Sequence, residues 1–108
     1  MKRVVPREVA EHDVDLAADF YTDEGGADFG QAFVDALENA YHAIAERPKT
    51  GSLWLGEAAT LPGLRTRRLR RFPYLVVYFE REDHIDVWRV LHLRRDLVAA
   101  LDADRSDS

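Results

Sequence analysis

The densest group of reactive side chains in this sequence is a run of arginines. Arginine fills five of the seven positions from 65 to 71, as Arg65, Arg67, Arg68, Arg70 and Arg71. The planar guanidinium group forms paired hydrogen bonds with a phosphate or a carboxylate, which indicates a site for an acidic partner. On a strand the cluster would divide between two faces. The other interpretation is structural, with edge-strand charges that block unwanted pairing or bridge to acidic helices.

A second group of polar side chains ends the last apolar segment of the chain. His92 stands there beside Arg94 and Arg95. Histidine exchanges protons near neutral pH, so His92 is a candidate acid or base, although a single histidine is more often a hydrogen-bonded structural residue. Arg89 lies within the apolar segment, where a charge must be paired or face a groove.

Other kinds of chemistry find no support in the residues. The chain has no cysteine, which excludes disulfides, cysteine-based zinc sites and thiol nucleophiles and is typical of a reducing cytosol. His12, His42 and His84 are not spaced as ligands of one metal ion. The sequence contains no glycine-rich phosphate loop and no dinucleotide fingerprint. We therefore expect neither a metal nor a cofactor.

The first residues and the hydropathy predict a cytoplasmic protein with no membrane contact. The segment MKRVVPREVAEHD has no apolar signal core. No stretch approaches the roughly 20 apolar residues that a membrane span needs.

Charge is distributed unevenly along the 108 residues, whose net charge is −5. Residues 1–60 hold 5 Lys and Arg against 12 Asp and Glu, residues 61–98 hold 9 against 5, and the last ten hold 1 against 3, giving −7, +4 and −2. A net-negative protein is repelled by nucleic acid at long range, so any contact with a polyanion has to be local.

The first half of the chain predicts a short strand and two helices. Residues 1–5 read as an edge strand that ends at Pro6, and apolar residues at helical spacing predict a helix over 6–23, which the following glycines end. Asp28 and Gln31 form a candidate capping pair for a second helix, which runs to the residue before Pro48. The short link predicts an antiparallel helical hairpin.

The second half predicts a sheet. Residues 48–63 read as a long surface loop held by Trp54 or Leu55. Strands are expected over 64–72, 75–79 and 85–91, followed by a short helix over 97–101 that Asp96 caps. The fold class is therefore α+β, with an N-terminal strand and a helical hairpin packed on an antiparallel three-stranded meander. The opposite sheet face needs a partner or polar groups. Residues 1–102 form one domain, and 103–108 form an acidic, disordered tail.

Four segments together resemble toxins of the RelE/ParE superfamily from bacterial type II toxin–antitoxin modules. They are DLAADFY (15–21), ALENAYHAIAERPKTG (36–51), LPGLRTRRLRRFPYLVVYF (61–79) and HIDVWRVLHLRRD (84–96). The resemblance covers about nine-tenths of the chain and implies a small sheet with a helical hairpin, a cognate antitoxin and growth arrest by the free toxin.

The superfamily has two branches with different targets. RelE-like toxins cut messenger RNA on the ribosome with basic residues and a tyrosine or histidine near the C-terminus, whereas ParE-like toxins poison DNA gyrase. Here no tyrosine follows His92 and no lysine follows Lys49. Cleavage of RNA needs both a base and an acid, and His92 alone can supply only one of them. The ParE-like branch is therefore favoured. The alternative is a ribosome-dependent endoribonuclease that uses Arg68 and His92, and a third hypothesis is a binding module that has lost its toxicity.

The expected antitoxin complex is a hetero-oligomer. An apolar groove between hairpin and sheet, flanked by arginines, would suit an acidic amphipathic helix or extended arm. The candidate residues for binding the target or the antitoxin are Arg65, Arg67, Arg68, Arg70, Arg71, Arg89, His92, Arg94 and Arg95.

Overall fold

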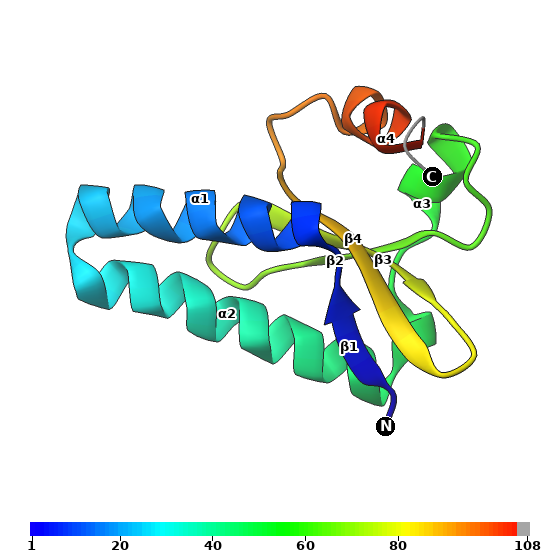
Figure 1. Ribbon diagram of the computed structural model, residues 1–108, viewed down its shortest axis with the longest axis horizontal. Coiled ribbons are helices and arrows are strands. Elements are labelled where there is room, and N and C mark those ends of the chain that lie inside the picture. Colours follow the sequence, from blue (N-terminus) through cyan, green and yellow to red (C-terminus); the bar gives the residue numbers. More distant parts are fainter. Residues whose placement is uncertain (106–108) are drawn as a thin grey trace.

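A computed structural model describes residues 1–105 and has one four-stranded sheet between two groups of helices (Figure 1). The elements are β1 (Arg3–Pro6), α1 (Glu8–Gly25), α2 (Ala27–Glu46), the 3₁₀ helix η1 (Pro48–Thr50), α3 (Trp54–Ala58), β2 (Arg65–Arg68), β3 (Tyr74–Glu80), β4 (His84–His92) and α4 (Leu97–Arg105). The strand order is β1-β4-β3-β2, with β1 parallel to β4 and the other pairs antiparallel. The sheet is therefore mixed, and the predicted α+β class and meander are confirmed.

The hairpin of α1 and α2 turns at one glycine. Gly26 has a φ of 91°, a region open to glycine, and its N–H donates to the carbonyl oxygen of Thr22 at 2.8 Å. Because α2 begins at the next residue, Asp28 already lies inside the helix. The predicted Asp28–Gln31 cap was therefore wrong, and Gln31 donates to Asp35 instead, at 3.0 Å.

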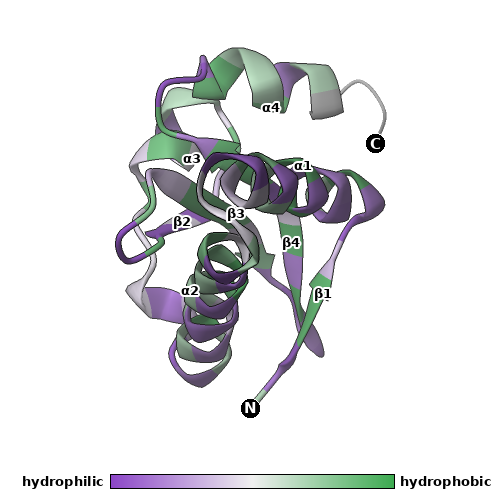
Figure 2. Cartoon of the chain, turned by 90° about the vertical axis from the view of Figure 1, so that its left-hand side faces the viewer, coloured by the Kyte–Doolittle hydropathy of each residue, from purple (hydrophilic) through white to green (hydrophobic). Residues whose placement is uncertain are grey.

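The hairpin buries its apolar side against one face of the sheet. Phe33 and Ile44 of α2 are fully buried together with Tyr78 and Ile85 of the sheet. Figure 2 shows the corresponding mixture of hydrophilic and hydrophobic residues along both helices. For α2 this arrangement confirms the helical periodicity seen in the sequence.

The other face of the sheet is covered by the chain itself. Leu55 of α3 and Leu101 of α4 are fully buried and join Trp88 and Leu91 of β4 in a second apolar cluster. The expectation that this face needs a partner or polar groups was therefore wrong. The segment 48–63 is likewise not one loop, because it contains η1 and α3. Leu55, and not Trp54, anchors it, since Trp54 is 51% exposed.

Two strand and helix boundaries also differ from expectation. β2 ends at Arg68, not at residue 72, because the chain turns so that Leu69 and Phe72 enter the core while Arg71 takes a φ of 72°. Asp96 caps α4 as predicted, accepting the N–H of Ala99 at 3.0 Å. α4 continues to Arg105, so residues 103–105 of the expected tail are helical, and 106–108 lie outside the described residues.

Within residues 1–105 no helix is long and apolar enough to cross a membrane.

Candidate partner-binding surface

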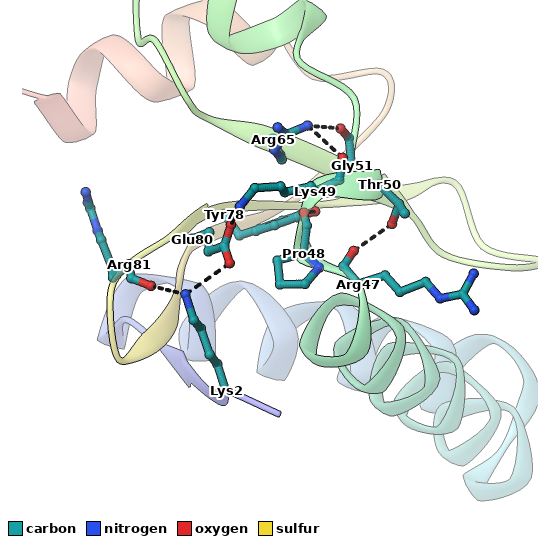
Figure 3. Close-up of polar contacts among 10 residues, drawn as sticks. All are labelled: Lys2, Arg47, Pro48, Lys49, Thr50, Gly51, Arg65, Tyr78, Glu80 and Arg81. Carbon is teal, nitrogen blue, oxygen red and sulfur yellow. Dashed lines mark hydrogen bonds and ion pairs between the residues drawn. The ribbon is translucent and has the colours of Figure 1, made fainter.

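Arg65 is half-buried, and its guanidinium binds the protein's own backbone. Its guanidinium donates to the carbonyl oxygens of Lys49 and Gly51, at 2.9 and 2.8 Å (Figure 3). The hydroxyl of Tyr78 donates to the carbonyl oxygen of Pro48 at 2.7 Å. Both side chains thus fix the segment after α2 to the sheet. A Cβ on Gly51 would collide with the Tyr78 hydroxyl, so this segment lies directly on the strands.

The lysines near this segment share one carboxylate. Lys49 and Lys2 both bind the carboxylate of Glu80, at 2.8 and 3.0 Å (Figure 3). Hydrogen bonds from Lys49 and Lys2 hold the pKa of Glu80 below its ordinary value. One carboxylate therefore serves two lysines, and the positive charge at this end of the sheet is balanced only in part.

Asp86 of β4 pairs with two arginines at the same time. It accepts a bidentate contact from Arg7, at 3.0 Å for both oxygens, and a bond from Arg81 at 2.9 Å. Burial opposes ionisation of Asp86, but the hydrogen bonds from Arg7 and Arg81 outweigh it and lower the pKa of the carboxyl. The Arg7 guanidinium also lies 4.4 Å from the centroid of the Trp88 ring. Nothing in the sequence pattern pointed to this cluster.

Four arginines of the sequence cluster remain on the surface. Arg67 is half-buried, and Arg68, Arg70 and Arg71 are exposed. Among the side chains that the structure describes, none of the four has a carboxylate partner. Arg67 and Arg68 lie on β2, and Arg70 and Arg71 lie on the turn into β3, so the four are not on one continuous strand. The positive surface foreseen from the sequence is therefore present here, without Arg65.

Arg89 is buried in an ion pair. Its guanidinium donates to both carboxylate oxygens of Asp13 in α1, at 2.7 and 2.8 Å, and the N–H of Val90 donates to Asp13 at 3.0 Å. The two side chains are 7% and 9% exposed. A bulge between β3 and β4 adds a residue near this position. The sequence left two alternatives for Arg89, a paired charge or a charge that faces a groove. The structure has the paired charge, and the guanidinium is buried.

His92 lies at the wall of a surface pocket of about 240 Å³ between α1 and the end of β4. Its lining residues are Asp13, Leu16, Ala17, Phe20, Tyr74, Val90, His92 and Arg95. The Nδ1 atom of His92 accepts the N–H of Arg94 at 3.0 Å, which leaves the proton of a neutral ring on Nε2. Arg95 stands at the rim and is exposed, as is Arg94. The pocket thus joins an apolar wall to a basic rim.

Two exposed apolar side chains form the outer wall of this pocket. Leu16 is 57% exposed and Phe20 is 53% exposed, although both were assigned to the helical stripe in the sequence. Large apolar groups left in water at a pocket are typical of an interaction site. The sequence could not distinguish Leu16 and Phe20 from the buried residues of α1, because both sets are apolar and recur at helical spacing.

The chemistry available around His92 is limited. Tyr74 is its neighbour across β3 and β4, with ring centroids 5.1 Å apart. Burial, with Tyr21 and Asp13 nearby, raises the pKa of Tyr74, so its hydroxyl is a weaker acid than usual at neutral pH. Asp13 is engaged with Arg89. Arg68 is on β2, separated from β4 by β3, which places the two backbones roughly 10 Å apart. The arrangement suits binding better than proton transfer.

The fold is shared with a known toxin–antitoxin chain. A solved structure described as "Chromosomal ParDE TA system from P. aeruginosa" matches with a TM-score of 0.72 and 20% identity, covering 87% of this chain and 98% of that one. Comparison with curated protein sequences gives no match.

The family follows from the sequence match. The model of the family described as "ParE toxin of type II toxin-antitoxin system, parDE" matches residues 4–97. The chain belongs to this ParE toxin family, which confirms the resemblance drawn from the four segments. A type II toxin implies an antitoxin as partner.

Proposed function

We propose that this protein arrests bacterial growth by inhibiting DNA gyrase in the cytoplasm, and that a cognate antitoxin neutralises it in a hetero-oligomeric complex. The observation that carries the proposal is the pocket of His92, which has a basic rim and exposed apolar walls. Of the described acids that line it, Asp13 is paired with Arg89, and burial raises the pKa of Tyr74. Such a surface suits a macromolecular partner. Membership of the ParE family supports gyrase as the target.

The direct test is a supercoiling assay with the purified chain and purified gyrase. We expect loss of supercoiling and an increase in cleaved DNA, because a poison stabilises the cleaved state. A denatured sample of the same chain is the control. If supercoiling continues unchanged with the chain in stoichiometric excess, gyrase is not the target.

The alternative target is messenger RNA on the ribosome, and the contact between Tyr74 and His92 is the observation that favours it. This alternative predicts truncated transcripts in ribosome-containing extracts, with the activity lost in Arg68→Ala and His92→Ala. Normal growth on expression without an antitoxin would instead identify a binding module that has lost its toxicity.

We propose that the antitoxin occupies the pocket between α1 and β4. An amphipathic acidic segment would place apolar side chains against Leu16 and Phe20 and its carboxylates beside Arg94 and Arg95. Charge reversal of Arg94 and Arg95 should weaken the complex and change its salt dependence. An unchanged affinity of that variant for the antitoxin would place the partner elsewhere.

A further inference from the structure

A second, smaller pocket lies between α2 and β2, apart from the pocket of His92. Its volume is about 50 Å³, and its lining residues are Ala36, Asn39, Ala40, Arg67, Arg68 and Arg70. A space of this size accommodates a small group such as a carboxylate, or a few water molecules. No role has been assigned to it so far.

The polar residues that line the pocket are three arginines and one asparagine. Arg67, Arg68 and Arg70 carry guanidinium donors, and none of the three has a carboxylate partner among the described side chains. The side-chain amide of Asn39 adds two further donors. Three positive charges at one small hollow repel each other, and an anion placed between them would relieve that repulsion. The lining therefore selects an anionic group.

The apolar lining comes from two small residues of α2. Ala36 is half-buried and Ala40 is buried, and their methyl groups leave the hollow open where longer side chains would fill it. A methyl wall suits the methylene stem of an Asp or Glu side chain. The combination of donor groups and methyl groups thus fits an amino-acid carboxylate.

The surroundings disfavour a nucleic acid at this place. Asp35 and Glu38 are exposed on the same helix, within one turn of Asn39. An extended phosphate backbone that entered the pocket would pass these carboxylates and meet a protein whose net charge is −5. A single acidic side chain with uncharged or basic neighbours avoids that repulsion.

We propose that the pocket of Arg67, Arg68, Arg70 and Asn39 binds one isolated Asp or Glu side chain of a protein partner. The planar guanidinium forks supply the paired hydrogen bonds, and the acidic residues of α2 exclude partners with continuous negative charge. This inference goes beyond the proposed function, because it concerns a different surface and holds whether or not gyrase is the target.

The test is a nuclear magnetic resonance titration of the purified chain. The probes are an otherwise uncharged pentapeptide with one central Glu, the same peptide with Gln, inorganic phosphate, and a short single-stranded DNA. The readouts are the side-chain amide of Asn39 and the Nε–H groups of the arginines. The protein variants are Arg68→Gln with Arg70→Gln, and Arg47→Gln as a control that removes one positive charge outside the pocket, since Arg47 is exposed and is not among the pocket-lining residues.

We expect saturable shifts at Asn39 and at the pocket arginines with the Glu peptide, and none with the Gln peptide. The double variant should bind the Glu peptide roughly tenfold more weakly, whereas Arg47→Gln should change the affinity less than about twofold. Absence of saturation, or equal binding of both peptides, overturns the proposal. Tighter binding of phosphate or DNA than of the Glu peptide also overturns it and identifies a nucleic-acid site. None of these readouts depends on growth arrest or on gyrase.

Discussion

The ion pair of Asp13 and Arg89 gives the strongest test of the energetics of this fold. Both side chains are more than nine-tenths buried, and Asp13 satisfies three N–H groups on β4. Changing Asp13 to Leu removes a carboxylate that binds the buried guanidinium of Arg89 through two hydrogen bonds. Such a loss costs about 3–5 kcal/mol. A domain of this size has a free energy of unfolding of about 5–15 kcal/mol, so the change removes a large part of the total.

The comparison of three variants separates the charge from the packing. Asp13→Leu and Arg89→Met should each be strongly destabilised, because Asp13→Leu takes a carboxylate partner from the buried Arg89 guanidinium and Arg89→Met takes the guanidinium from the buried Asp13 carboxylate. The double variant Asp13→Leu with Arg89→Met carries no buried charge and should lose only about 1–2 kcal/mol, mainly because the N–H of Val90 lacks its acceptor. Its loss should therefore be smaller than that of either single variant.

The measurement is urea unfolding, followed by the fluorescence of the buried Trp88 and checked by circular dichroism. The single variants should also melt roughly 12–30 °C below the parent chain. The reasoning fails if either single change costs less than about 1 kcal/mol. It fails equally if the double variant loses the sum of the two single losses, because the charges would then act independently.

Three further predictions concern other parts of the molecule. Gly51→Ala should cost about 1–3 kcal/mol of unfolding free energy, measured in urea, because the new methyl group meets the Tyr78 hydroxyl. Asp86 has a lowered pKa, so its stabilisation is present above the ordinary pKa of an aspartate and is lost as pH falls through the lowered value. Asp86→Asn should therefore unfold about 1–2 kcal/mol more easily at neutral pH and lose less stability on acidification, as urea curves across pH would show. Phe20→Ser should keep the parent melting temperature but weaken antitoxin binding at least tenfold, as measured by calorimetry. Val9 is also exposed on α1 but does not line the pocket of His92, so Val9→Ser should leave the affinity unchanged.

The parts of the fold that depend on local pattern could be predicted from the sequence. The apolar spacing that buries Phe33 and Ile44 repeats over several turns, and the consecutive apolar residues of β3 mark a strand buried on both faces. The helix α3 has five residues and depends on the burial of Leu55 by residues far away in the sequence. Its own sequence therefore predicts a loop and not a helix. The left-handed conformation of Arg71, which ends the strand region early, has no local sign either.

The candidate site could be predicted in residue type but not in pairing. The arginine cluster was visible, yet the bonds that occupy Arg65 come from a segment 14 and 16 residues away, and the partner of Arg89 lies 76 residues away. The contact of Tyr74 with His92 depends on the register of two strands. These relations require the folded sheet, so sequence reasoning could state alternatives but could not choose between them.

The position of β4 in the middle of the sheet has a consequence for synthesis of the toxin. β1 is made first, but its only neighbour in the sheet is β4, which spans His84–His92. Until the ribosome has translated this segment, β1 lacks the strand with which it pairs in the sheet, and Asp13 lacks the Arg89 guanidinium. A polypeptide that stops before His84 therefore lacks β4, and this sheet forms only after residues 84–92 have been made.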